Sequence, residues 1–229
     1  MKTITWLSPQ DAPERFPPLE RALDEPPGLL AAGGDLSAPR LLAAYRRGIF
    51  PWYSPGQPVL WWSPDPRAVL FPDEFRCSRS LAKTLRNGGF DTRIDYDFAA
   101  VIEGCAAPRP SSAGTWITRE MRTAYLELYR QGHAHSIETY LKGRLAGGLY
   151  GVRLGGVFFG ESMFSRERDA SKVALARLVE LCRTDAIAVI DCQLSSRHLE
   201  SLGSRLVPRS EFQALLREHI PPASVDARR

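Results

Sequence analysis

The distribution of proline divides this chain into two parts. Residues 8–72 hold 13 of the 18 prolines in a sequence of 229 residues. Proline lacks a backbone N–H and disrupts helix interiors and central strands, so this segment is expected to consist mostly of turns. One helix interrupts it, with Ser37 as its N-cap, Pro39 in its first turn and Gly48 after its last turn.

From about residue 68 the sequence becomes periodic. Runs typical of strands alternate with segments whose apolar residues recur at helical spacing. The helices are expected to begin near Ser80, Asp97, Thr118, residue 169, Ser196 and Ser210, the last with a capping box formed with Gln213. The strands are expected at 90–94, 135–141, 145–154, 157–164 and 186–194.

The last of these strands, AIAVIDCQL, begins as a continuous apolar run, which is typical of a central strand buried on both faces. The whole pattern predicts a mixed α/β fold with a mixed sheet. A small domain rich in proline and tryptophan would cover residues 1–67, and a larger domain would cover residues 68–229.

The composition excludes several classes of protein. No segment approaches the roughly 18 apolar residues of a membrane span, and the N-terminus lacks the apolar core of a secretion signal. The four cysteines are far apart, which argues against a zinc site or a disulfide framework and favours free thiols in a reducing cytoplasm. No metal site is expected, because His133 and His135 lack a third ligand. The net charge of +4 is compatible with nucleic-acid contact or with a biased, arginine-rich composition.

Three segments are candidates for a functional site. Aromatic and arginine residues alternate over 45–67, which suits either stacking on bases and pairing with phosphates or a small aromatic core. Glu161 lies within an apolar strand, where an unpaired carboxylate is costly. Asp191 and Gln193 share one face at the end of the most apolar strand, which is typical of a site or of a strand that emerges into solvent.

These segments belong to a series of ordered motifs that extends over about residues 28–213. The motifs are GLLAAGGDLS (28–37), AYRRGIFPW (44–52), LWWSPDPRAVL (60–70), GTWIT (114–118), GHAHSIE (132–138), GESMFSR (160–166), ASK (170–172) and DCQ (191–193). In their order and spacing they resemble the bacterial leucyl/phenylalanyl-tRNA–protein transferase family.

The resemblance implies an aminoacyltransferase whose larger domain has an acetyltransferase-like (GNAT) fold and which needs neither a metal nor a nucleotide cofactor. It implies transfer of Leu or Phe, and less well Met, from Leu-tRNA or Phe-tRNA to proteins or peptides with N-terminal Arg or Lys. The modified proteins would be marked for degradation by the N-end rule pathway. A monomer in the cytoplasm, away from membranes, is expected.

The resemblance also assigns the catalytic residues, which are Asp191, Gln193 and Glu161. A neutral carboxamide is a poor base, so we expect Gln193 to aim the lone pair of the attacking amine rather than to abstract its proton. Asp191 would hold Gln193 or stabilise the ammonium that develops during attack. Glu161 would orient the donor or attract the cationic side chain of the acceptor.

Other side chains are assigned to the donor. Its Leu or Phe side chain would enter a pocket of Leu149, Phe158, Leu178 and Ile190. Its terminal adenosine would lie against Tyr45, Trp52, Trp116 and Tyr125. Its tRNA body would contact a stripe whose spacing also suits a solvated helix face, formed by Arg76, Arg79, Lys83 and Arg86.

Two of these residues, Phe158 and Glu161, can line the same pocket only under one condition. Phe158 and Glu161 point to opposite faces of a regular strand. Both can line one pocket only if Gly160 marks a bulge or the end of the strand.

Three other functions remain open. An acetyl-CoA-dependent acetyltransferase would need a Q/R-x-x-G-x-G/A loop before a helix, and residues 144–149 only approach this pattern and are predicted to be a strand. A non-catalytic RNA-binding module would explain the aromatic and arginine residues but not the acidic ones, Glu161 and Asp191. A cell-wall aminoacyltransferase would share the donor but not the acceptor.

Overall fold

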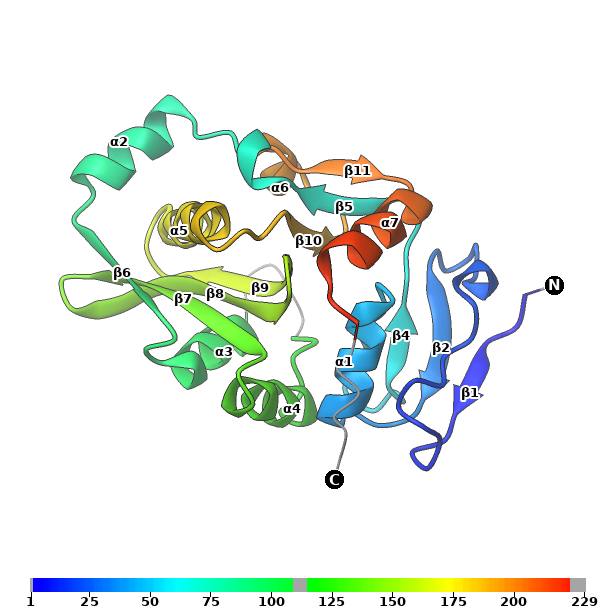
Figure 1. The fold of residues 1–229 in the computed structure, drawn as a ribbon. Helices are drawn as coiled ribbons and strands as arrows, with labels where there is room; N and C mark the ends of the chain where they lie inside the picture. The colour runs from blue at the N-terminus through cyan, green and yellow to red at the C-terminus, as the bar shows by residue number, and fades with distance from the viewer. Residues whose placement is uncertain (1, 109–114, 223–229) are drawn as a thin grey trace, which may run out of the picture.

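The structure is a computed structural model that describes residues 2–108 and 115–222 (Figure 1). Its strands are β1 (Thr5–Leu7), β2 (Leu29–Gly33), β3 (Phe50–Pro51), β4 (Leu60–Trp62), β5 (Arg67–Leu70), β6 (Phe90–Ile94), β7 (Ala134–Leu141), β8 (Arg144–Leu154), β9 (Val157–Ser165), β10 (Val189–Gln193) and β11 (Arg205–Val207). Its α-helices are α1 (Ala38–Arg46), α2 (Arg79–Asn87), α3 (Phe98–Ala106), α4 (Arg119–Arg130), α5 (Ala170–Thr184), α6 (Arg197–Ser201) and α7 (Arg209–His219).

The strands form two sheets. A four-stranded sheet has the order β1-β2-β4-β3, and a seven-stranded sheet has the order β11-β5-β10-β9-β8-β7-β6. Neighbouring glycines of β8 show how helices cover both faces of the large sheet, because Gly147 lies against α5 and Gly148 against α3. The expected mixed α/β class is therefore confirmed.

The N-terminal segment is more regular than its prolines predict. Helix α1 is confirmed, although the Ser37 side chain makes no capping hydrogen bond. The prediction that the remainder consists mostly of turns is confirmed for most of its length, but short strands interrupt it, and β2 pairs parallel with β1 and antiparallel with β4. These strands have only two to five residues each, which is too short for an alternating apolar pattern to be recognised.

The two predicted domains share a hydrophobic core. Strand β5 begins at Arg67 and lies in the large sheet between β10 and β11. Helix α7 returns to the N-terminal segment, and a Cβ added to Gly48 would lie 3.0 Å from the Phe212 ring and 3.2 Å from Leu216. Buried residues of both segments form one cluster. The division into residues 1–67 and 68–229 stays a prediction.

The predicted central strand is present but shorter than expected. Strand β10 covers Val189–Gln193 rather than residues 186–194. Ala186 has a positive φ of 54°, so the chain turns before the strand begins. As predicted, β10 is central, with β5 antiparallel on one side and β9 parallel on the other.

Most of the helix starts agree with the sequence. Three residues at which helices are expected to begin are N-caps that accept a backbone N–H through their side chains: Asp97, Thr118 and Ser196. Helix α2 is capped by Ser78 rather than by Ser80. The predicted capping box at Ser210 is wrong, because α7 begins directly after Pro208 and Ser210 lies inside its first turn.

Strands β9 and β10 separate soon after they pair. Their parallel ladder extends only from Val157 opposite Val189 to Phe159 opposite Asp191. Strand β9 then continues to Ser165, while β10 shifts its register against β5 and ends. The separation leaves room between two neighbouring strands of the sheet.

A bulge in β9 lies at this point of separation. Its register with β8 passes from Ser162 opposite Tyr150 to Gly160 opposite Gly151, so Glu161 has no partner residue in β8. The bulge that the strand parity requires beside Gly160 is therefore present, and it redirects the side chains that follow it.

The glycines on the two sides of this bulge differ in the space around them. A Cβ on Gly151 would lie 2.2 Å from the Phe159 carbonyl oxygen and 2.5 Å from the Phe158 ring, whereas a Cβ on Gly160 would meet nothing closer than 3.4 Å. We expect Gly151→Ala to lower the free energy of unfolding by about 1–3 kcal/mol. Gly160→Ala, the matched control, should change it by less than about 0.5 kcal/mol. Urea unfolding of both variants measures the difference, and equal losses would contradict this account of the bulge.

Candidate active site

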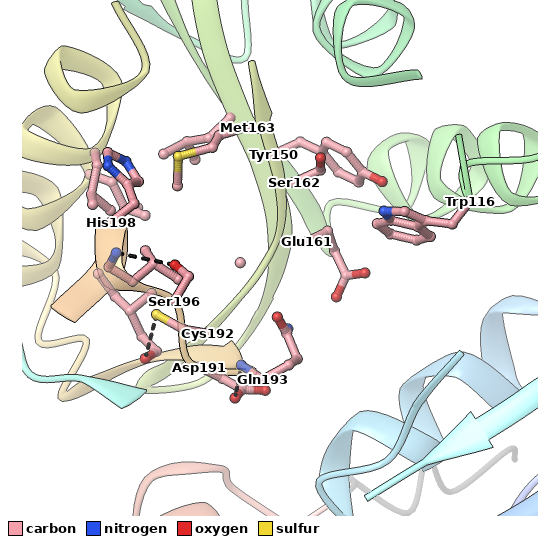
Figure 2. Close-up of a pocket in the computed structure, with 16 residues that line it drawn as sticks. Trp116, Tyr150, Glu161, Ser162, Met163, Asp191, Cys192, Gln193, Ser196 and His198 are labelled. Carbon is pink, nitrogen blue, oxygen red and sulfur yellow. Dashed lines mark hydrogen bonds between the residues drawn. The ribbon is translucent and has the colours of Figure 1, made fainter. Parts of the chain in front are cut away.

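A pocket of about 410 Å³ opens where β9 and β10 separate (Figure 2). Its apolar wall is formed by Leu149, Met163, Leu175, Leu178, Ile190 and Leu199. Its polar wall contains Glu161, Asp191 and Gln193. The pocket therefore joins an apolar cavity to a small group of polar side chains, which is typical of a binding site for a small organic group.

A second hollow of about 210 Å³ lies beside the pocket. The two share Trp116, Glu161, Cys192 and Gln193, and the second adds Phe50, Pro51, Trp52 and Leu194. One cavity is bounded by aliphatic side chains and the other by two tryptophans. They meet at Glu161 and Gln193.

Asp191 is held by Arg67 in a completely buried ion pair. The Arg67 Nε and Nη2 atoms each donate to one carboxylate oxygen at 2.7 Å, and the two side chains are 1% and 0% exposed. The Arg67 Nη1 atom donates to the Gly48 carbonyl at 3.0 Å. The guanidinium also lies 4.8 Å from the ring centroids of Phe50 and Phe212. This planar group makes the bidentate contact and both ring contacts at once, which an ammonium could not do.

Asp191 also fixes the backbone of Gln193. The Gln193 N–H donates to Asp191 Oδ1 at 3.0 Å, and Gln193 has a left-handed φ of 56° that non-glycine residues seldom adopt. Its side chain points toward Glu161 in Figure 2. Its buried amide nitrogen has no hydrogen-bond partner among the residues that the structure describes. A strained backbone and an unpaired buried amide are typical of a residue placed for a ligand.

Glu161 is bound by two tyrosine hydroxyls from distant segments. Tyr45 of α1 and Tyr125 of α4 each donate to one of its carboxylate oxygens at 2.7 Å, and the two hydroxyl oxygens are 2.5 Å apart. Two phenol protons cannot serve all three of these contacts. When Glu161 is protonated, its O–H supplies the third proton by donating to one tyrosine hydroxyl. That hydroxyl then donates to the second tyrosine instead of to Glu161, and the second tyrosine donates back to the carboxyl group, which gives a ring of three hydrogen bonds.

The electrostatic surroundings of Glu161 favour the same protonated form. Burial and, to a smaller extent, the nearby charge of Asp191 together raise the pKa of its carboxyl group to about 7, against the opposing effect of the tyrosine hydrogen bonds. Burial and the charge of Glu161 hold the pKa values of Tyr45 and Tyr125 well above their usual range. Glu161 is therefore the group in this site that changes its charge near neutral pH.

Comparison with models of known protein families shows which family the chain belongs to. The model described as leucyl/phenylalanyl-tRNA protein transferase matches residues 69–217, and the model of the N-terminal domain of this transferase matches residues 34–65. The chain belongs to the leucyl/phenylalanyl-tRNA–protein transferase family. The resemblance that the motifs indicate is therefore confirmed.

Individual relatives in the leucyl/phenylalanyl-tRNA–protein transferase family are similar over nearly their whole length. The transferase of Stutzerimonas stutzeri is 57% identical over 226 residues, which cover 98% of this chain and 99% of the relative. The transferase of Azotobacter vinelandii is 58% identical over 212 residues, covering 92% of this chain and 94% of the relative.

Solved structures with a similar arrangement include acetyltransferases. A GCN5-related N-acetyltransferase from Kribbella flavida has a TM-score of 0.42 at 9% identity and covers 73% of this chain and 59% of its own. A GCN5-related N-acetyltransferase-like protein from Streptococcus suis has a TM-score of 0.37 at 14% identity, with 70% and 60% coverage. Both belong to the class that the resemblance implies, but these TM-scores lie below 0.5, so the mixed α/β assignment rests on the sheets themselves.

The structure places most of the expected donor residues around the two hollows. Leu149, Leu178 and Ile190 line the pocket, and Trp52 and Trp116 line the second hollow. Phe158 is 2% exposed and packs in the cluster behind the pocket without lining it. In this structure it supports the pocket wall from behind, and its contact with the donor side chain stays a prediction.

The contact of Tyr45 and Tyr125 with the donor adenosine also stays a prediction. Both side chains are 0% exposed, and their hydroxyls are bound to Glu161. In this structure the two tyrosines position the Glu161 carboxyl group.

The predicted basic stripe lies outside both hollows. Arg79, Lys83 and Arg86 lie on α2 and Arg76 precedes it, and all four are exposed. Their side chains form no ion pair with any residue that the structure describes, so their charges face solvent.

Sequence reasoning missed several residues of the site. Arg67 is part of a recognised motif but received no role, although a buried Asp191 requires a cationic partner. The pocket residues that received no functional role include Met163, Leu175, Ser196 and His198. They lie near one another only because α5 and α6 fold over the separated strands.

The side chains of the pocket are suited to positioning a substrate rather than to forming a covalent bond with it. Burial raises the pKa of the Cys192 thiol to about 12, so the thiol stays protonated and is a poor nucleophile. Over residues 2–108 and 115–222, no three His, Cys, Asp or Glu side chains lie close enough together to hold a metal ion. Within the same ranges no helix has the length and apolar character needed to cross a bilayer.

The Arg67–Asp191 pair predicts strong coupling between two substitutions. Arg67→Met should lower the free energy of unfolding by about 3–5 kcal/mol, because it leaves a buried carboxylate without a partner. Asp191→Asn in the same chain should recover part of this loss, because the amide carries no charge. A double-mutant cycle in urea measures the coupling, and losses that simply add would show that the pair does not act as a unit.

The raised pKa of Glu161 predicts a pH dependence of stability. Its pKa rises from an ordinary 4.5 to about 7 in the folded protein, so the folded protein binds more protons than the unfolded chain between these values. The stability that this difference contributes is present below about pH 4.5 and is lost as the pH rises through about 7. Between pH 5 and 8 the parent should therefore lose stability relative to Glu161→Gln. Urea unfolding across this range tests the difference, and parallel pH profiles would contradict it.

Proposed function

We propose that this chain transfers Leu or Phe, and less well Met, from aminoacyl-tRNA to the N-terminal Arg or Lys of acceptor proteins, which marks them for N-end rule degradation. Membership of the leucyl/phenylalanyl-tRNA–protein transferase family supports the donor and the reaction class. The observation that carries the proposal is that an apolar pocket and a tryptophan-lined hollow meet at Glu161 and Gln193. A cytoplasmic location and a monomeric state stay predictions.

The two hollows suit the two ends of an aminoacyl-adenosine. The aliphatic wall of the pocket would take the Leu or Phe side chain, and selection by shape is worth roughly 1–3 kcal/mol per methylene. Trp52 and Trp116 would hold the adenine ring by stacking, which does not require a particular nucleotide sequence. With both ends bound, the ester carbonyl would lie between them, beside Gln193.

The tRNA body would contact the basic stripe of α2. Arg79, Lys83 and Arg86 are exposed and unpaired within the described part of the chain, as is Arg76 before the helix. Such side chains contact phosphates without reading bases, so binding there would depend strongly on salt.

The reaction requires no covalent enzyme intermediate, because the donor is already an activated ester. The acceptor's amine nitrogen attacks the ester carbonyl carbon, a C–N bond forms and the bond to the 3′ oxygen breaks. The amine loses a proton and the 3′ oxygen gains one. A terminal amine with a pKa of about 7.7–8.0 is partly neutral near pH 7, and correct orientation can supply about 7–11 kcal/mol of the barrier.

Gln193 and Asp191 would act together in this orientation. The Gln193 side-chain oxygen would accept an N–H of the attacking amine and thereby aim its lone pair at the carbonyl carbon. Both Asp191 oxygens are bound by Arg67, and one also accepts the Gln193 N–H. Of the two roles expected for Asp191, these contacts favour that of holding Gln193.

Glu161 would attract the cationic acceptor. It lines both hollows, and its pKa of about 7 allows an arriving positive charge to stabilise its ionised form. An acidic group in an otherwise basic protein fits an acceptor that carries Arg or Lys at its N-terminus.

An acetyl-CoA-dependent reaction is not favoured by the structure. Residues 144–149, the nearest approach to a pyrophosphate-binding loop, lie inside β8. The two glycines of this segment lie against helices on opposite faces of the sheet, Gly147 against Ala170 and Gly148 against Val101.

The proposed function is tested by transfer of labelled Leu from Leu-tRNA to peptides that begin with Arg, Lys or Ala, with metals chelated and acetyl-CoA omitted. Transfer is expected to the Arg and Lys peptides but not to the Ala peptide. Gln193→Asn keeps an amide that tolerates the left-handed backbone but shortens its reach, and we expect kcat to fall at least about 100-fold.

The matched control is Gln131→Asn, the same chemical change at an exposed position after α4. It should leave transfer unchanged. Binding of tRNA without transfer to any peptide would favour a non-catalytic RNA-binding module. Full activity of Gln193→Asn would keep the function but place the orientation of the amine elsewhere.

A further inference from the structure

A second group of basic residues lies at the end of the large sheet beyond the pocket. Strand β9 extends four residues past Glu161 to Ser165, about 13 Å along the strand, and Arg166 follows. At the same end, β7 turns into β8 through Lys142 and Gly143, because Leu141 pairs with Arg144. Since β9 and β10 are parallel, this is the end of the sheet toward which both strands of the pocket run.

Three cations surround a hollow at this end. Lys142, Arg144 and Arg166 are exposed and line a space of about 640 Å³ together with Glu167. None of the three forms an ion pair with a residue in the described part of the chain. We call Lys142, Arg144 and Arg166 the hairpin edge.

The nearby acidic residues other than Glu167 are already paired. Asp169 lies 2.8 Å from Lys172 and 3.6 Å from Arg168, and Asp91 lies 3.1 Å from Arg93. The hairpin edge therefore carries a net positive charge that is not neutralised locally.

The hairpin edge is also preorganised. The Arg166 guanidinium lies 5.3 Å from the Phe164 ring centroid and donates to the Leu145 carbonyl at 3.3 Å. The turn has φ values of 51° at Lys142 and 75° at Gly143, which is the conformation of a tight two-residue hairpin. The turn fixes the backbone from which Lys142 and Arg144 extend, and the two contacts of Arg166 hold its guanidinium in place.

The hairpin edge is connected to the helix of the basic stripe through β6. Helix α2 ends at Asn87, and after a short turn Phe90 pairs with Leu141, the residue before Lys142. Figure 1 shows α2 and the β7–β8 hairpin on the side of the molecule away from β1 and β2. The two basic groups therefore lie on the same side of the molecule, on separate elements.

We infer that the hairpin edge is a second contact for the phosphate backbone of the donor RNA, on the base-paired stem behind its single-stranded aminoacylated end. This inference rests on the proposed function. A charged, base-independent surface suits a stem that must be shared by tRNAs of different sequence. Its position beyond the pocket suits a stem whose single-stranded end reaches back to Gln193.

The test uses the full chain with Lys142→Asn and Arg144→Gln combined. Asn-Gly is a favoured pair for this turn, so the hairpin should fold normally. We expect binding of full-length aminoacyl-tRNA to weaken roughly tenfold near 150 mM salt, and the slope of log affinity against log salt to decrease by about 1.4–1.8. Transfer from a short aminoacylated CCA donor, which has no stem, should be unchanged.

The matched control is the variant with Arg21→Gln and Arg217→Gln, which removes the same charge from exposed positions outside the hairpin edge. It should leave the salt slope unchanged. An equal loss in this control, unaltered tRNA binding in the hairpin variant, or loss of activity on the short donor would each overturn the inference.

Binding and transfer are measured separately. A parent chain that binds tRNA but transfers nothing would refute the proposed function, while the binding comparison would still decide whether the hairpin edge contacts RNA. Vesicles with anionic phospholipid are included as a competing polyanion. If the hairpin variant loses vesicle binding but keeps tRNA binding, the hairpin edge is a membrane contact and the inference is wrong.

Discussion

The buried contact between Arg67 and Asp191 is the interaction on which the site depends. One guanidinium connects β5 to β10, binds the carbonyl that follows α1 and is enclosed by rings from β3 and α7. A buried ion pair adds little net stability, because the loss of hydration offsets most of the attraction. Breaking it leaves a buried charge, however, so the chain is restricted to arrangements that keep the two residues together. The same pair fixes the backbone N–H of Gln193.

A second buried polar assembly lies on the other side of Gln193. Glu161 reaches Tyr45 and Tyr125 because the bulge in β9 redirects its side chain at the point where the sheet opens. Residues from α1, α4 and β9, separated by as many as 116 positions in the sequence, share one ring of hydrogen bonds. Both assemblies place polar groups inside an otherwise apolar interior, where each group needs its partner.

This arrangement fits a reaction in which the substrate is already activated. A thiol that stays protonated supplies no nucleophile, and the two hollows would instead hold the two ends of one donor on either side of a fixed amide. The acidic and the basic groups also lie in different places. Glu161 and Asp191 are inside the site, where a cationic acceptor would arrive, and unpaired cations are on the outer surface, where RNA phosphates would lie. Catalysis by orientation depends on rigid elements, and the strands, bulge and buried pairs provide them.

Several features follow from the sequence alone. The periodic segments predict most of the helices and the large-sheet strands, because the 3.6-residue and two-residue repeats of apolar side chains follow directly from local geometry. The motifs resemble one family, and they contain Glu161, Asp191 and Gln193. The short N-terminal strands and β11 escape prediction, because two to five residues carry too little pattern.

Only the tertiary structure decided which side chain serves which partner. Tyr45 and Tyr125 are expected beside the donor but are buried against Glu161, and Arg67 has no expected role but holds Asp191. The hairpin edge likewise arises only when β7, β8 and β9 pair and bring Arg166 beside the β7–β8 turn. A linear pattern records the local preference of a residue for a strand, a helix or the interior. The partner of a buried polar group depends instead on how distant segments pack, which no local pattern records.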